Sequence, residues 1–324
     1  MRKSKYSQYD VERVVWLVYK REMLQSEVSK ELGIPRPVIS RMLKYAREKG
    51  MIEIKVNLGD DANLFEIASD LKREFDLKEV IIAPTGSTDE DTKERIAIKA
   101  ADYLARIFLK RSDFRNVGVS WGTTLYKVIC YLPSEMGDGG IVVPLVGGVG
   151  GKAAEFHSNN IARELAKKLS AEWFPLYAPA ILRNNLVKGF LYNEFIIQDV
   201  FEKMRRVEIA IVGIGSINPN STMLKAGYFK PDEFLEFGKE GIIGDVCSYF
   251  FNINGNVSFD INKNVVGIDS EDLKKIPLVV GIAGGGEKVY AIYGALKGKL
   301  VNVLITDAIC GRKILDKNKK NMKG

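Results

Sequence analysis

The residues best suited to chemistry in this chain stand in glycine-rich turns that follow apolar, strand-like runs. The segment VGVSWGTTLY places Gly122, Thr123 and Thr124 between such a run and a helical pattern. Glycine lets backbone N–H groups approach an anion, and the free N–H groups of a helix N-terminus favour negative charge. Two adjacent hydroxyl groups at that place suit a phosphate. The alternative is ordinary capping of the helix by a threonine side chain.

Further turns of the same kind follow other strand-like runs. They contain Gly147 and Gly148 in VPLVGGVGG, Gly213 and Gly215 in IVGIGS, and residues 284–286 in VVGIAGGGEK. Lys288 follows the last turn at the expected start of a helix, where its ammonium would balance the charge of a phosphate. A solvated surface lysine is the alternative.

Asp245 and His157 are the candidates for contacts to the rest of such a ligand. Asp245, in GIIGDVCSYFF, lies between apolar runs, where an unpaired carboxylate would be costly and the hydroxyls of a polyol would satisfy it. It could instead cap a helix or pair with a nearby cation. His157, the only histidine, could bond a sugar hydroxyl, although a lone histidine is often structural. The expected ligand-binding set is Gly122, Thr123, Thr124, Gly147, Gly148, His157, Asp245 and Lys288.

The elements that must position these residues alternate between strand and helix. Strand-like runs lie at 80–83, 117–120, 141–146, 174–177, 209–214, 278–283 and 301–306. Helical periodicity lies at 64–75, 91–109, 123–132, 158–169, 195–204, 231–238, 287–296 and 308–315, before an end that we expect to be frayed and solvated. Apolar strands with intervening helices indicate an α/β fold, a Rossmann-like parallel sheet with helices on both faces. Ligands of such sheets bind beyond the carboxyl ends of the strands, so we expect the glycine turns to meet there.

Composition and charge divide the chain into a basic head and an acidic body. The 324 residues carry a net charge of +7 and are 46% hydrophobic, which is enough for real cores and suggests two domains. Residues 1–57 hold 13 Lys and Arg against 7 Asp and Glu, whereas residues 58–311 hold 29 against 33. A short basic tail, 312–324, follows. This asymmetry indicates an anionic partner for the head, nucleic acid first.

Several classes of protein are disfavoured by what the sequence lacks. No apolar run reaches the roughly 18–20 residues of a membrane span, and no apolar core of a signal peptide follows the basic start, so we expect a cytoplasmic protein without a membrane partner. The three cysteines, Cys130, Cys247 and Cys310, are far apart and form no CxxC pair. A structural disulfide, a Cys-based zinc site and a His-rich metal site are therefore not expected. We predict no cofactor.

The head has the residue spacing of a helix-turn-helix. Counted from Gln25, small Ser29 is fifth, where two helices approach closely, and Gly33 is ninth, where the turn needs a positive φ. Pro37 suits the first turn of the second helix. Ser26 is a possible N-cap of the first helix. Met51–Val56 alternates like a short strand, so the prediction is a winged helix-turn-helix domain over residues 1–57.

The second helix of this motif is the expected recognition helix. Arg36, Ser40, Arg41 and Lys44 would reach base edges and phosphates, and Gln25 and Ser26 would meet a phosphate. The alternative is a small three-helix bundle with a solvated basic face. Spacing, charge and position in the chain together favour binding of double-stranded DNA.

The order and spacing of these motifs resemble a known family. The head LQSEVSKELGIPRPVISRMLKYAREKGMIEIKV, followed by VGVSWGTTL, GGVGG, GIG, GIIGDVCSYFF, GIAGGGEKVYAIYGALKG and LVNVLITD, resembles the SorC/DeoR-type sugar-responsive bacterial transcription regulators. The resemblance implies a winged helix-turn-helix at 1–57. It also implies an effector and oligomerisation domain at 58–324, similar in fold to sugar-phosphate isomerases and deaminases.

The resemblance further implies a phosphorylated sugar as effector, and dimers that assemble into tetramers. By motif, Gly122, Thr123 and Thr124 match the family's phosphate loop, and Asp245 and Lys288 match its acidic residue and its lysine. The chain departs from the usual pattern at Val146, at His157, where relatives often carry Gln, and in FFN at 250–252, which replaces FFD. These positions would touch the sugar.

We therefore expect a DNA-binding repressor of a sugar-metabolism operon, controlled by a phosphorylated sugar, and not an enzyme. The first alternative is a sugar-phosphate isomerase or deaminase with an accessory DNA-binding domain, in which Asp245 would be the base and His157 its partner. The second is a constitutive DNA-binding or structural protein with a vestigial pocket.

Overall fold

The computed structural model divides the chain into two compact units, Met1–Gly59 and Asp60–Gly324. It describes residues 7–54, 62–110, 116–136, 139–148, 154–219, 221–225 and 227–321. The predicted boundary between residues 57 and 58 lies outside the described residues.

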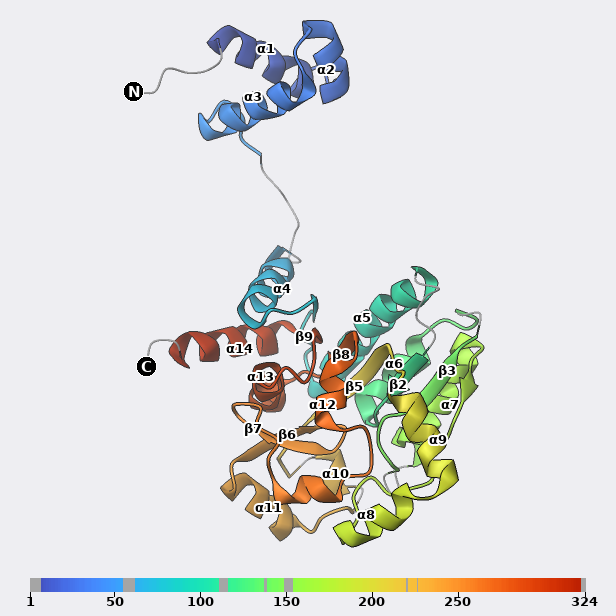
Figure 1. Cartoon of the computed structure of the whole chain (residues 1–324). Helices are drawn as coiled ribbons and strands as arrows, with labels where there is room; N and C mark the ends of the chain where they lie inside the picture. The colour runs from blue at the N-terminus through green and yellow to red at the C-terminus, as the bar shows by residue number, and fades with distance from the viewer. Residues whose placement is uncertain are drawn as a thin grey trace. The chain divides into compact units, whose positions relative to one another are not determined.

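The first unit is built from three helices, α1 (Gln8–Tyr19), α2 (Gln25–Leu32) and α3 (Arg36–Glu48) (Figure 1). Their shared core is apolar and contains Val11, Val14, Leu17, Val28, Ile39, Met42, Leu43 and Ala46. Gly33 ends α2 with φ of +65°, and the Ser29 hydroxyl donates to the Ile34 carbonyl at 2.7 Å. These contacts set the tight connection to α3, as the spacing predicts.

Two details of the predicted head differ from the structure. The N-cap of α2 is Leu24, whose N–H donates to Glu27 Oε2 at 2.8 Å, so Ser26 lies inside the first turn and does not cap the helix. Residues 51–54 form no strand, and the rest of the predicted wing, 55–56, lies outside the described residues.

The second unit is built on a parallel sheet, which confirms the predicted α/β fold. Its parallel strands are β1 (Glu79–Ala83), β2 (Asn116–Val119), β3 (Ile141–Pro144), β4 (Glu172–Trp173), β5 (Ile209–Ser216), β8 (Leu278–Ile282) and β9 (Val303–Asp307). They lie in the order β1-β9-β8-β5-β2-β3-β4.

An antiparallel hairpin, which the sequence patterns did not predict, extends the sheet. Its strands β6 (Ile242–Val246) and β7 (Tyr249–Asn252) are joined at a tight turn, and β6 pairs with the end of β5. The register sets Gly215 opposite Asp245. The hairpin thereby places Asp245, which lies between two apolar runs in the sequence, at the carboxyl edge of the sheet.

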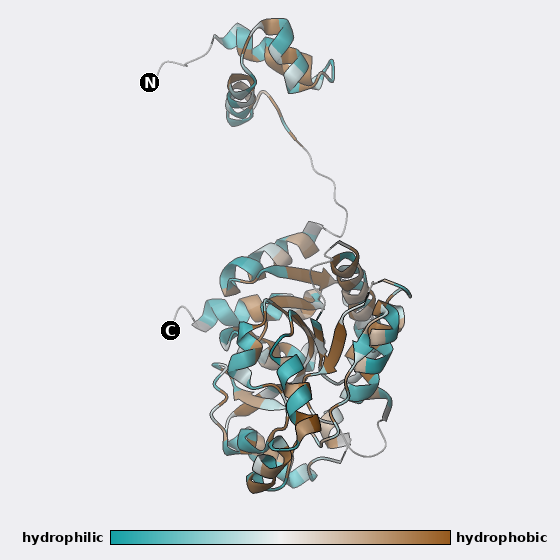
Figure 2. Ribbon diagram, turned by 45° about the vertical axis from the view of Figure 1, so that its right-hand side comes forward, coloured by the Kyte–Doolittle hydropathy of each residue, from teal (hydrophilic) through white to brown (hydrophobic). Residues whose placement is uncertain are grey.

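Helices cover both faces of the sheet (Figure 1). One face carries α5 (Asp89–Lys110), α6 (Thr123–Tyr131) and α7 (Ser158–Leu169); the other carries α4 (Ala62–Phe75), α9 (Phe195–Met204), α13 (Val289–Lys297) and α14 (Ala308–Asn321). Side chains of β5 alternate between the two faces. Ile209 and Ile211 belong to the core beneath α5, α6 and α7, and Ala210 and Val212 belong to the core on the other face. Figure 2 shows apolar strands inside and hydrophilic helix surfaces outside.

Shorter elements complete the unit. They are the helices α8 (Asn185–Tyr192), α10 (Thr222–Lys225), α11 (Pro231–Lys239) and α12 (Ser270–Lys275), and the 3₁₀ turns Ala154–Phe156, Asp260–Asn264 and Gly286–Lys288.

Three predicted elements need correction. Residues 174–177 do not form the expected strand. The strand in this region is the two-residue β4, which ends at Trp173. The helix expected from Glu287 begins at Val289, after a 3₁₀ turn. The C-terminal segment is not frayed after Leu315: α14 continues to Asn321, because Asn318 is buried and its amide donates to Glu74 Oε2 at 3.2 Å.

Candidate functional site

The sheet has a topological switch between β2 and β5. After β2 the chain turns to β3 on one side, and after β5 it continues to β8 on the other. Such a switch opens a crevice at the carboxyl ends of the strands. A cavity of about 310 Å³ lies there, and its lining includes Asp89, Lys93, Gly122, Thr123, Thr124, Gly213, Gly215, Asn218, Asp245 and residues 284–288.

The N-terminus of α6 faces this cavity with unsatisfied donors. Gly122, with φ of +138°, is the N-cap, and its N–H donates to the Phe156 carbonyl at 3.2 Å. Neither Thr123 nor Thr124 uses its hydroxyl in a hydrogen bond with another residue that the structure describes. The first N–H groups of a helix also lack an acceptor within the helix. The alternative of threonine capping is therefore wrong, and both hydroxyls are available to an anion.

The glycine turn after β8 is held in place by Asp307, at the end of β9. The Gly285 N–H donates to Asp307 Oδ2 at 2.7 Å, and the Thr85 hydroxyl donates to its Oδ1 at 2.7 Å. A Cβ on Gly284 would lie 2.6 Å from the same Oδ2, so that position requires glycine. Asp307 positions the loop that carries Lys288 into the cavity. Asp307 was not among the predicted site residues, and its signal in the sequence is its place at the end of a strand-like run.

Asp245 enters the cavity from the hairpin and packs directly on β5. A Cβ on Gly215 would lie 1.8 Å from Asp245 Oδ1, so only glycine allows the carboxylate this position. The Ser248 N–H donates to Asp245 Oδ2 at 3.2 Å, and the Trp121 indole N–H donates to Ser248 Oγ at 3.3 Å. These bonds orient the carboxylate, which is 8% exposed.

Burial controls the charges of the two principal ionisable groups. It raises the pKa of Asp245 to about 6, although the Lys288 ammonium and the Ser248 N–H act in the opposite direction. Burial also lowers the pKa of Lys288, and the charge of Asp245 opposes this. The cavity thus combines free donors and a cation for an anionic group with a carboxylate that can accept bonds from hydroxyls.

Other lining residues were missed by sequence analysis. Asp89 and Lys93 come from the first turns of α5, and Asn218 follows β5. Periodicity assigns α5 to a helix but does not reveal that its N-terminal end reaches the cavity. The Ser120 hydroxyl accepts from the Gly213 N–H at 3.1 Å and so joins the two strands at the crevice.

The structure separates Gly147, Gly148 and His157 from this cavity. Gly148 and His157 line a second cavity of about 1400 Å³, and Gly147 lines neither. The N–H groups of Gly147 and Gly148 donate to the carbonyls of Val266 and Ala178 at 2.8 and 2.7 Å. Contrary to expectation, these N–H groups are already used and do not face an anion.

Packing explains the glycine at 148, because a Cβ there would lie 2.0 Å from His157 Cε1. His157 stands at the N-cap position of α7 without a side-chain capping bond, and burial lowers its pKa. The second cavity is also lined by Arg183 and Lys230, neither of which the sequence patterns predicted.

The candidate DNA-contacting residues share one exposed face of α3. Arg36, Ser40 and Lys44 recur every four residues, and all are exposed, as is Arg41, whose Nε donates to the Pro37 carbonyl at 3.3 Å. Gln25 and Ser26 lie in the first turn of α2, half-buried and exposed respectively. The arrangement is that of a helix with a basic outer face above the apolar core of the head.

The described part of the chain contains neither a candidate membrane span nor a candidate metal cluster. None of its helices is both long and apolar enough to cross a membrane. It also contains no group of three or more His, Cys, Asp or Glu side chains that could hold a metal ion.

Comparison with known proteins identifies the architecture. Residues 61–316 match the family described as "Putative sugar-binding domain" (Sugar-bind). The chain belongs to this family. Its match spans almost the whole second unit, including both cavities. The resemblance inferred from the motifs is thereby confirmed.

Relatives with similarity along nearly the whole chain are transcriptional regulators. The deoxyribonucleoside regulator of Bacillus subtilis is 31% identical over 303 residues, covering 93% of this chain and 95% of that protein. The sorbitol operon regulator of Klebsiella pneumoniae is 30% identical over 299 residues, covering 91% and 94%. A crystal structure of the full-length sorbitol operon regulator SorC from Klebsiella pneumoniae matches with a TM-score of 0.73 and 29% identity, covering 95% of this chain and 98% of that one.

Proposed function

We propose that this protein is a cytoplasmic DNA-binding repressor of a sugar-metabolism operon, released from its operator by a phosphorylated sugar. The effector binds in the cavity between β2 and β5. Its phosphate lies against the N-terminus of α6 and Lys288, and its hydroxyls bond to Asp245. The protein acts as a homodimer or homotetramer, as its resemblance to the family implies.

The observation that carries this proposal is the pair of unused hydroxyls at the start of α6. Thr123 and Thr124 line the cavity without capping the helix, and Lys288 faces the same space. Helix N-terminal donors, hydroxyls and an ammonium together form a site for a phosphate group. The names of the relatives support sugar or nucleoside operons as targets.

The basic face of α3 supports the DNA-binding part of the proposal. Arg36, Arg41 and Lys44 contact phosphates and base edges of the operator, and Gln25 and Ser26 contact its backbone. Effector binding changes operator affinity through a free-energy difference between two arrangements of the assembly, typically about 1–3 kcal/mol.

The enzymatic alternative loses its proposed pair of catalytic groups. Asp245 lines the first cavity, and His157 lines the second. A general base and its partner must both come within hydrogen-bonding reach of one substrate. A binding function for Asp245, without turnover, is therefore the simpler interpretation.

The direct test measures DNA binding with and without effector. DNA selected from a random pool by the full chain is labelled, and its affinity is measured by fluorescence anisotropy with a panel of sugar phosphates. We expect one of them to weaken DNA binding by roughly 5- to 150-fold. A panel without effect on a protein that binds DNA refutes effector control and favours a vestigial pocket.

A thermal-shift measurement with the same panel locates the ligand. A ligand at 100 times its dissociation constant should stabilise the second unit by about 2.7 kcal/mol. The double variant Thr124→Val with Lys288→Ala should lose the shift, and a shift that survives places the phosphate elsewhere. Coupled isomerase and deaminase assays form the control, since turnover abolished by Asp245→Asn would establish the enzyme instead.

A further inference from the structure

A second lysine, Lys93 of α5, shares the cavity between β2 and β5 with Lys288. It was not among the predicted ligand-binding residues. The two ammonium groups approach from opposite parts of the chain, one from the start of α5 and the other from the turn before α13. They are close enough for the positive charge of Lys93 to lower the pKa of Lys288.

We propose that Lys93 is a second phosphate-binding cation of this site and faces the phosphate opposite Lys288. This assignment rests on the proposed function and deepens it. The ammonium groups of Lys93 and Lys288 repel each other in the cavity. A phosphate dianion bound between them would attract both, and these attractions would outweigh the repulsion. The hydroxyls and N–H groups at the start of α6 line the same cavity.

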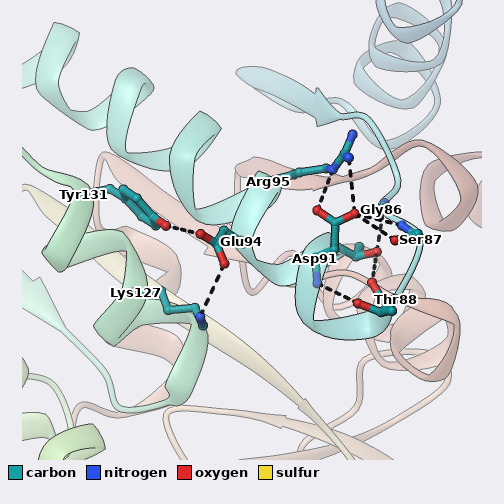
Figure 3. A network of polar contacts seen from close by, with 9 residues as sticks. Gly86, Ser87, Thr88, Asp91, Glu94, Arg95, Lys127 and Tyr131 are labelled. Atoms are coloured by element: carbon teal, nitrogen blue, oxygen red, sulfur yellow. Dashed lines mark hydrogen bonds and ion pairs between the residues drawn. The ribbon is translucent and has the colours of Figure 1, made fainter.

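Hydrogen bonds anchor the first turn of α5, which precedes Lys93 in the chain (Figure 3). Asp91 Oδ2 accepts from the Ser87 N–H at 2.9 Å, and Asp91 Oδ1 accepts from Arg95 Nε at 2.9 Å. The Gly86 N–H donates to Thr92 Oγ1 at 3.0 Å. This network fixes the first turn, from which Lys93 extends.

The present partner of Lys93 can release it. Its ammonium lies 3.7 Å from Glu90 Oε2, and this ion pair is long and exposed. Glu90 makes a closer pair with Lys127, at 2.9 Å. Lys127 also contacts Glu94, which accepts from the Tyr131 hydroxyl (Figure 3). When Lys93 turns to a phosphate, Glu90 keeps Lys127 and is not left unpaired.

The test is isothermal titration calorimetry of the full chain with inorganic phosphate and with the sugar phosphate that shifts its melting temperature. Lys93→Met should weaken both ligands by roughly 10- to 100-fold, because one charged hydrogen bond is lost. Lys93→Arg should retain much of the affinity. Lys99→Met is the matched control, since Lys99 is exposed on the same helix and does not line the cavity.

A second variant should act in the opposite direction. Glu90→Gln removes the carboxylate that competes for Lys93 and should tighten binding of inorganic phosphate a few-fold. Equal affinity of Lys93→Met and Lys99→Met overturns the assignment while leaving the proposed function intact. Loss confined to the sugar phosphate also overturns it, because Lys93 would then contact the sugar. A wild-type chain that binds neither ligand refutes the proposed function itself.

Discussion

Replacing Asp245 by asparagine should stabilise the unliganded protein at neutral pH. Burial raises the pKa of this carboxyl from 3.8 to about 6. The folded chain therefore binds this proton more tightly than the unfolded chain, and the free energy of unfolding falls as the pH rises from about 4 to about 6. A difference of about two pH units corresponds to about 3 kcal/mol at pH 7.5.

Asparagine keeps the shape of the carboxyl without its charge, so Asp245→Asn should recover much of this energy. Because Lys288 loses its neighbouring carboxylate, we expect a net gain of about 1–3 kcal/mol at pH 7.5, or roughly 2–4 °C in melting temperature for each kcal/mol. At pH 4.5 the advantage should shrink to at most about 1 kcal/mol. Urea unfolding followed by tryptophan fluorescence at both pH values measures the difference, and Trp121 lies in the same cavity.

The matched control is Asp316→Asn, which removes an exposed carboxylate on α14 and should change stability by less than about 0.5 kcal/mol at either pH. An Asp245→Asn protein that is no more stable than wild type at pH 7.5 would refute the argument that burial dominates this site. The same variant should bind sugar phosphates weakly and inorganic phosphate at least as tightly as wild type, because it loses the carboxylate that accepts from hydroxyls and relieves Lys288 of a competing anion.

Three further substitutions probe other parts of the molecule. Thr124→Val should reduce the thermal shift by sugar phosphates yet change the unliganded stability by less than about 0.5 kcal/mol, since its hydroxyl does not cap α6; a large loss without ligand would contradict this. Gly215→Ala should cost about 1–3 kcal/mol in chemical denaturation, because its Cβ would meet the Asp245 carboxylate, and an unchanged midpoint would show that the hairpin yields freely. Arg41→Ala should weaken operator binding and lower the slope of log affinity against log salt by about 1; an unchanged slope would remove Arg41 from the DNA interface.

Local patterns predicted most of the fold because each of them acts within a few residues. Gly33 needs a positive φ, and Pro37 suits a first helical turn, wherever the head is placed. Continuous apolar runs identified β5, β8 and β9 because strands buried on both faces leave no place for polar side chains. The hairpin of β6 and β7 was missed because its turn uses Cys247 and Ser248, both with positive φ, instead of the usual Asn or Gly.

Some residues of the candidate site were also predictable from local patterns, and others were not. Thr123, Thr124 and Lys288 were recognisable because a glycine turn before a helix is a local anion-binding motif. Lys93 and Asp307 carry no such signal, and they reach the cavity only because α5 and β9 are placed beside the switch between β2 and β5.

The type of most elements, the basic head and the glycine turn before α6 follow from the amino-acid sequence alone, since periodicity, charge and glycine conformation are properties of neighbouring residues. The strand order and the separation of His157 from Asp245 follow only from tertiary packing. The distance between these two residues in space depends on which strands become neighbours. That choice is made by side chains far apart in the chain when they close the two cores on either side of the sheet.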